Sequence, residues 1–117
     1  MEKSAKKQIR SKQVKEVTTY PVSYSTGTLK DNISTLDNPL AKVMQIRGTE
    51  FDWKDGNPNY KGHDIGVIAQ DVESVLPDAV STKPDGTKGV HYNKLIPLLI
   101  EAVKDLSKQV DDLSSDK

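Results

Sequence analysis

The sequence of 117 residues predicts one small α+β domain of short strands and helices that ends in a long C-terminal helix. Three observations predict it: short segments rich in β-branched and aromatic residues, turn signals between them, and a heptad repeat near the C-terminus. Only 34% of the residues are hydrophobic. A core this small gives marginal stability, so self-association is expected.

The first part of the chain predicts little regular structure. Residues 1–13 show no helical or strand periodicity and are expected to form a flexible or extended lead-in. Residues 14–24 alternate Val and Tyr with Thr and Ser, a composition that favours a strand. Pro21 confines that strand to an edge or an irregular position.

A short helix is predicted over Asp37 to Ile46. Asp37 or Asn38 is the expected N-cap and Pro39 fits the first turn, where its missing N–H has no partner to lose. Gly48 is expected to end this helix.

A hairpin is predicted next, because Phe51 and Trp53 alternate with charged residues and residues 55–59 carry turn signals. After a brief apolar run at 65–69, residues 71–76 predict one or two helical turns stopped by Pro77. A second hairpin is predicted from residues 80–83 and 88–92, which flank the turn sequence PDGT.

The C-terminal helix is predicted over residues 93–115, with Asn93 as its cap and Pro97 in its first turn. Apolar residues recur on it at spacings of three and four, which predicts a coiled-coil seam: Ile96, Leu99, Val103, Leu106, Val110 and Leu113. Leu95, Leu98 and Ala102 form a second stripe that is expected to pack on the domain body. In this repeat Ile96, Val103 and Val110 occupy heptad position a, and the three leucines occupy position d. β-Branched residues at a with Leu at d favour a dimer.

The composition excludes several classes of partner and cofactor. Seventeen basic and seventeen acidic residues balance, so nothing suggests a nucleic-acid or membrane partner. The chain has no cysteine and no apolar run near the roughly 18 residues of a membrane span. His63 and His91 are expected to be structural, and no cofactor or metal site is predicted because the His, Asp, Glu and Gly spacings match no known motif.

Three segments carry a family resemblance. Ile46 to Trp53 reads IRGTEFDW, Ile65 to Glu73 reads IGVIAQDVE, and Val90 to Leu95 reads VHYNKL. In this order and spacing they resemble the C-terminal intramolecular chaperone domain of bacteriophage tailspikes, tail fibres and endosialidases, also classed as peptidase S74. The resemblance implies a homotrimer, against the dimer that the a and d residues favour. It also implies that the IGVIAQDVE segment defines the fold.

The resemblance also implies a self-cleaving Ser–Lys dyad. Self-cleaving members carry Ser-Asp-x-Arg-x-Lys, with the serine as nucleophile, the lysine as base and the scissile bond just before the serine. Ser25 and Lys30 match the dyad, which puts the cut between Tyr24 and Ser25, but Thr26 and Thr28 replace the usual Asp and Arg. A free lysine with a pKa of about 10.4 is charged, so Lys30 would need to be desolvated in the assembled trimer to act as a base.

The resemblance therefore predicts an intramolecular chaperone, with residues 1–24 ending an upstream fibre or spike and residues 25–117 forming the chaperone. Three copies would align the upstream chain for folding in the host cytoplasm and then release themselves, leaving the fibre on the virion tail. A non-cleaving trimerisation cap is the first alternative, favoured by the two threonines. The second is the self-cleaving module of a membrane-tethered transcription factor, whose DNA-binding domain and membrane span are not found in this sequence.

Overall fold

The computed structural model describes residues 22–115, which divide after Ile33 into two units. In the first unit, residues 22–33 contain one 3₁₀ turn, η1 (Gly27–Leu29), and every side chain is exposed. The strand predicted over residues 14–24 lies largely outside the described residues. Its described part, from Val22 to Tyr24, is not a strand.

The second unit, from Ser34 onward, is a mixed α+β domain, as predicted. Its helices are α2 (Pro39–Val43), α3 (Ala69–Val75) and α4 (Leu95–Ser115). Its strands form two antiparallel hairpins, β1 (Thr49–Asp52) with β2 (His63–Gly66) and β3 (Val80–Thr82) with β4 (Lys88–Val90). Two 3₁₀ turns, η2 (Pro77–Ala79) and η3 (Tyr92–Lys94), precede β3 and α4.

The predicted helix over residues 37–46 is confirmed in place but is shorter, and its predicted boundaries are wrong. Asn38 precedes α2 in the left-handed region with φ of 46° and makes no side-chain capping bond, so it turns the chain instead of capping it. Pro39 occupies the first turn as expected. The helix ends at Val43, because two successive turns that close onto Lys42 and Val43 follow it well before Gly48.

Both predicted hairpins are present. In β1 the side chains alternate between half-buried and exposed, with Phe51 inside and its charged neighbours outside. The backbone N–H of Trp53 donates to Gly62 O at 2.9 Å and extends the pairing by one residue. The second hairpin closes through the turn at residues 84–87, where Gly86 has φ of 92°, a value that favours glycine.

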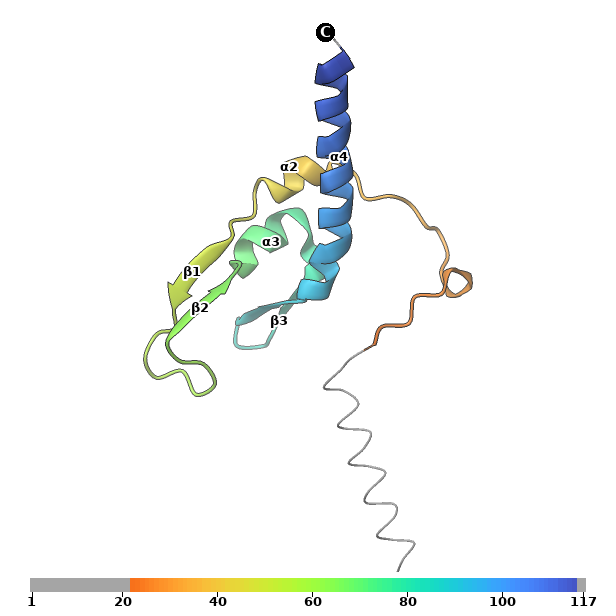
Figure 1. The fold of residues 1–117 in the computed structure, drawn as a ribbon. Coiled ribbons are helices and arrows are strands. Elements are labelled where there is room, and N and C mark those ends of the chain that lie inside the picture. The colour runs from red at the N-terminus through yellow and green to blue at the C-terminus, as the bar shows by residue number, and fades with distance from the viewer. Residues whose placement is uncertain (1–21, 116–117) are drawn as a thin grey trace, which may run out of the picture. The chain divides into compact units, whose positions relative to one another are not determined.

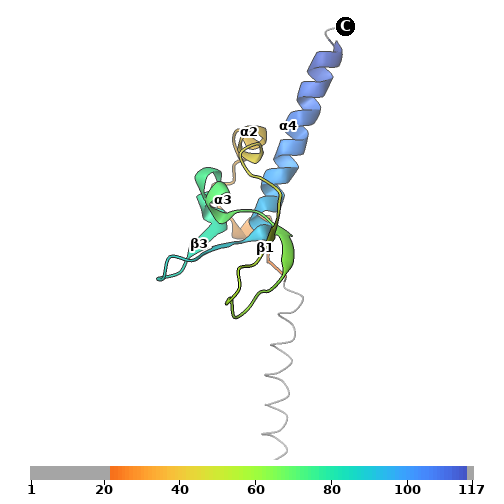
Figure 2. The same ribbon diagram turned by 90° about the vertical axis from the view of Figure 1, so that its left-hand side faces the viewer.

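The long helix α4 begins at Leu95, two residues later than predicted, after η3. Pro97 lies in its first turn, as predicted. Figures 1 and 2 show α2 and α3 beside the N-terminal half of α4, while the helix continues beyond them. The buried side chains of the described residues are few, and two of the four lie on this half of α4: Val72, Ala79, Leu98 and Ala102.

A close contact between β2 and η3 fixes the first hairpin against the base of α4. The hydroxyl of Tyr92 accepts a hydrogen bond from the Val67 N–H at 3.2 Å. A Cβ added at Gly66 would lie only 2.8 Å from that hydroxyl and 3.5 Å from the Phe51 ring. Gly66 is therefore required by the closeness of the tyrosine.

Replacing Gly66 with alanine should destabilise the domain by about 1–3 kcal/mol, because the added methyl group must displace Tyr92 and weaken its bond to Val67. The measurement is the urea midpoint at a fixed chain concentration. Gly89→Ala is the matched control, because nothing lies within 4 Å of its added Cβ. Equal midpoints for the two variants would contradict the steric explanation.

Candidate functional site

Ser25 and Lys30, the two predicted dyad residues, lie together. The Lys30 Nζ donates a hydrogen bond to the Ser25 Oγ at 2.6 Å. The turn η1 produces this closeness, because the N–H groups of Leu29 and Lys30 donate to the carbonyls of Thr26 and Gly27 at 3.0 Å. The turn brings residues 25 and 30 close together, so the Lys30 side chain reaches Ser25, which is five residues earlier in the sequence.

The dyad is open to solvent in the single chain, since both residues are exposed. A serine hydroxyl 2.6 Å from an amine has the geometry of a nucleophile and its base. In this contact the amine donates to the hydroxyl. For Lys30 to accept the serine proton instead, it would need to lose its water shell, because burial disfavours the charged form of an amine.

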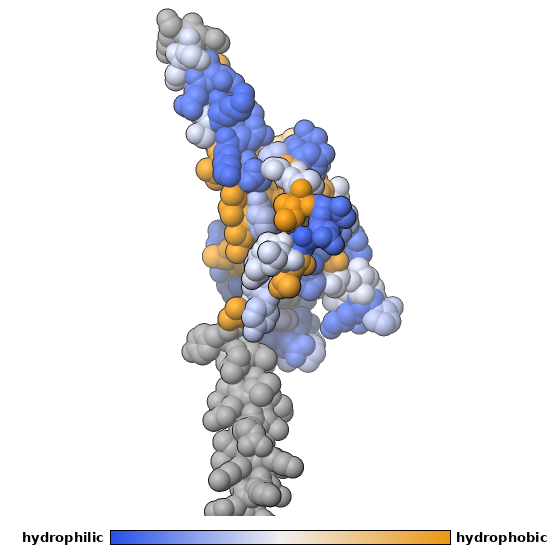
Figure 3. Space-filling model, turned by 90° about the vertical axis from the view of Figure 1, so that its right-hand side faces the viewer, coloured by the Kyte–Doolittle hydropathy of each residue, from blue (hydrophilic) through white to orange (hydrophobic). Residues whose placement is uncertain are grey.

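The predicted seam residues form an exposed apolar stripe along α4. Ile96, Leu99, Val103, Leu106, Val110 and Leu113 are each between 49% and 69% exposed. Figure 3 shows hydrophobic surface along the lower part of this helix. In contrast, Leu98 and Ala102 are buried against the domain body, as the second stripe predicted. This helix thus has two apolar faces, and within residues 34–115 only one of them is covered.

An ion pair joins two of the segments that carry the family resemblance, IRGTEFDW and IGVIAQDVE. The Arg47 Nε donates to an Asp71 carboxylate oxygen at 2.9 Å, and a second guanidinium nitrogen lies 3.5 Å from the other oxygen. The pair joins the segment before β1 to the first turn of α3. The hydrogen bond and the charge of Arg47 lower the pKa of Asp71 below its ordinary value. The IGVIAQDVE segment therefore has a structural role, since its Val72 is also fully buried.

His63 lies on the first hairpin, and His91 directly follows the second. On the first, the two ring nitrogens of His63 lie 3.0 Å from Glu50 and 3.2 Å from Asp52 across the strand pair. The His91 Nε2 lies 2.6 Å from the Ser81 Oγ. Sequence reasoning missed this serine. Ser81 pairs with Gly89 and contacts His91 diagonally across the hairpin, and such a contact is not visible in the sequence spacing.

Among residues 22–115, Ser81 and His91 have no third member of a catalytic triad. The hydrogen bonds of these residues include none in which a carboxylate accepts from the His91 ring. A triad needs such a group to orient the imidazole. The pair is therefore a cross-strand polar contact at the open face of the second hairpin.

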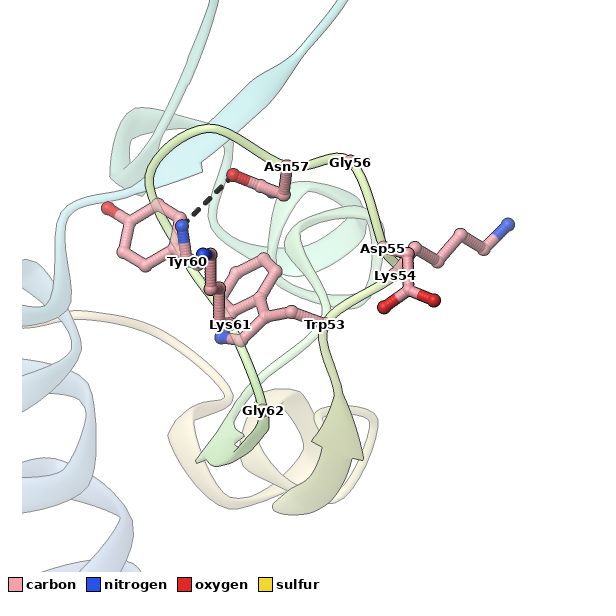
Figure 4. Close-up of a pocket in the computed structure, with 8 residues that line it drawn as sticks. All are labelled: Trp53, Lys54, Asp55, Gly56, Asn57, Tyr60, Lys61 and Gly62. Carbon is pink, nitrogen blue, oxygen red and sulfur yellow. Dashed lines mark hydrogen bonds between the residues drawn. The ribbon is translucent and has the colours of Figure 1, made fainter.

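A pocket of about 300 Å³ lies in the loop between β1 and β2. Figure 4 shows the Trp53 and Tyr60 rings side by side in this loop and the Lys54 side chain directed away from them. The two rings stack with centroids 4.5 Å apart. The Asn57 side chain accepts hydrogen bonds from the Asn59 and Tyr60 N–H groups, and the Trp53 Nε1 donates to Asp64 at 3.0 Å. These bonds shape the loop.

Within residues 22–115, no group of three or more His, Asp or Glu side chains is arranged to hold a metal ion. None of the helices described in it is long and apolar enough to cross a membrane.

Comparison with known proteins gives consistent matches. A family profile described as "chaperone of endosialidase" matches residues 25–81. The chain is 36% identical over 97 residues to the long tail fiber protein Gp37 of Enterobacteria phage K3 and equally to that of Enterobacteria phage T2, with 74% of this chain covered. It is 32% identical to Gp37 of Salmonella phage S16, with 76% covered. The chain spans 7% of the first two relatives and 13% of the third.

Neutralising Asp71 should reduce stability in a pH-dependent way. Because its folded-state pKa is lowered, Asp71 contributes stability above its unfolded pKa of about 3.9, and this contribution disappears as the pH falls through the folded value. The Tm of Asp71→Asn should therefore lie below that of the parent chain at pH 7, and this difference in Tm should narrow as the pH falls below about 4.

The measurement is thermal melting followed by circular dichroism between pH 7 and pH 3 at one chain concentration. Asp55→Asn, which neutralises an exposed loop carboxylate, is the control and should show no such gap. A gap for Asp71→Asn that stays constant with pH would show that the charge of Asp71 contributes nothing.

Proposed function

Because the chain belongs to the chaperone-of-endosialidase family, peptidase S74, we propose that it trimerises through α4 and aligns its own upstream tail-fibre chain for folding. We propose further that the domain then releases itself by cleaving its own chain before Ser25. The observation that carries the cleavage step is the 2.6 Å contact between the Lys30 Nζ and the Ser25 Oγ. The exposed seam of α4 supports the assembly step.

Alignment follows from holding three chains at one end. Once three copies of α4 associate in parallel, the upstream segments emerge together and their registration becomes effectively intramolecular. This removes much of the entropic cost of starting a long intertwined structure. The family resemblance favours three chains, whereas Val103 and Val110 at a with Leu at d favour two, so the stoichiometry is part of the proposal.

Cleavage proceeds by an acyl shift. The neutral Lys30 amine takes the Ser25 hydroxyl proton while the Ser25 Oγ attacks the Tyr24 carbonyl carbon. The bond between that carbon and the Ser25 nitrogen breaks, and Lys30 returns the proton to the departing amine. The ester that forms between Tyr24 and Ser25 is hydrolysed by water, which leaves a Tyr24 carboxylate and a free Ser25.

Assembly would control the timing of this reaction. In the single chain Lys30 is exposed, so its ammonium is solvated. Burial of the dyad in the assembled protein would disfavour the charged amine and supply the base. Cutting would then follow correct assembly, and the fibre left behind would be kinetically trapped.

The boundary between fibre and chaperone falls at the scissile bond in this proposal. Residues 1–24 end the upstream segment and residues 25–117 form the released domain. The family profile match begins at residue 25, which supports this boundary. The partners are two further copies of the chain and its own upstream segment. The protein would be made in the host cell, and the upstream product would be carried on the virion tail.

A permanent trimerisation cap is the second candidate. It is favoured by Thr26 and Thr28, which replace the family's usual Asp and Arg on either side of Gly27 in the dyad turn. The assembly step is the same in both candidates. Only the fate of the bond before Ser25 separates them.

Intact-mass spectrometry of the assembled chain tests the cleavage step. A fragment that begins at Ser25 should accumulate in the parent chain and be absent from Ser25→Ala. In Lys30→Ala, the rate should fall by about 10²-fold or more, because the general base is lost. Ser23→Ala, an exposed serine two residues upstream, is the control and should still cut. Full-length masses for assembled parent chain would leave the permanent cap as the function.

Sedimentation equilibrium tests the assembly step. Leu106→Asp places a charge in the middle of the seam, where burial without a partner is costly, so the mass should fall from three chains to one at the same concentration. Lys104→Asp makes a larger charge change on the polar side of the helix and should leave the mass unchanged. If both variants keep the parent mass, the seam is not the assembly surface.

A further inference from the structure

We propose that an apolar groove beside α4 receives Ile100 of a neighbouring copy, so that each chain docks a side chain into the body of the next. This inference rests on the proposed assembly through α4 and names the contact that completes it. Groove and side chain both belong to the second unit, from Ser34 onward.

The groove lies where α2 and the β2–α3 connection meet the first turns of α4. It has a volume of about 150 Å³ and is lined by apolar side chains: Val43, Ile46, Val67, Leu95, Leu98 and Leu99. A cavity of about this size is large enough to hold a benzene-sized apolar group. Five of the six side chains are left incompletely buried, so the groove is open to an incoming side chain.

Leu99 makes the groove continuous with the seam. It lines the groove and also occupies a d position of the heptad stripe, where it is 49% exposed. Leu95 lines the groove from the g position just before Ile96. The groove therefore opens on the g side of the seam, the same side on which Leu98 and Ala102 pack against the body.

Ile100 lies on the opposite side of the seam. It occupies the e position of the first heptad and is 50% exposed. Positions e and g usually carry charges that pair between helices. After Ile100, the e positions are Ser107 and Ser114 and the g positions are Ala102 and Gln109, so Ile100 is the one large apolar residue at an e position.

Parallel association brings the two sides together. In a parallel coiled coil, the g position of one heptad faces the e position of the next heptad on the neighbouring helix. Leu95 of one chain therefore faces Ile100 of the next, and Leu95 is a wall of the groove. Ring closure repeats the contact in every copy, because each chain presents a groove on one side and Ile100 on the other.

Disulfide cross-linking between two variants tests the contact cleanly, because the chain has no native cysteine. One variant carries Ile100→Cys and the other Ile46→Cys with a mass tag. The two are unfolded, mixed, refolded and oxidised. Since each chain holds a single thiol, only a bond between chains can form, and the expected product is a linked pair that contains one chain of each mass.

The matched control replaces Ile100→Cys with Ser107→Cys, which occupies the same heptad position one repeat later. It lies about 10 Å further along the helix, beyond the roughly 7 Å between Cα atoms that a disulfide spans. Val43→Cys serves as a second groove partner should Ile46→Cys disturb folding. Each variant oxidised alone should remain unlinked.

Sedimentation of the unoxidised mixture separates failure of this proposal from failure of the proposed function. Multimers with strong linkage from position 100 and little from position 107 support the groove contact. If multimers form but the groove cysteines at positions 46 and 43 link to position 100 no more than to position 107, the groove contact is overturned and the assembly proposal stands. A single-chain mass overturns both.

Discussion

The fold depends on the packing of one face of α4 against a very small body. Leu98 and Ala102 are two of the four buried side chains among residues 22–115, and the other two, Val72 and Ala79, come from α3 and η2. The first hairpin attaches to the base of this helix through Tyr92, which contacts Gly66 and Val67. If α4 were loosened, the body would lose half of its buried side chains and the anchor of its first hairpin.

The same helix has a second apolar face that residues 34–115 leave exposed, and in the proposed function this face links stability to assembly. A body that buries so little is marginal alone, and association of native chains stabilises the native state by mass action. In the proposed function, assembly has a second task, which is to remove water from the exposed Ser25 and Lys30.

Much of this fold could be predicted from local sequence. Period-two alternation at Phe51 and Trp53, the PDGT turn and the heptads of α4 are local patterns, and each produced the expected element. The prediction that the first helix ends at Gly48 was wrong, because tight turns after Val43 end α2 earlier. The spacing and the family resemblance also pointed to the pairing of Ser25 with Lys30. Contacts such as Arg47 with Asp71 could not be predicted, because they depend on how distant elements meet.

The strand pairing has a kinetic consequence. Both described sheets are hairpins between strands that neighbour each other in sequence, β1 with β2 and β3 with β4. Pairings of this kind close short loops and have low contact order, which favours rapid folding. A long intertwined fibre is the opposite case, since its contacts are distant or between chains and form slowly. A fast-folding template would thus be in place before the slow product has time to misassociate.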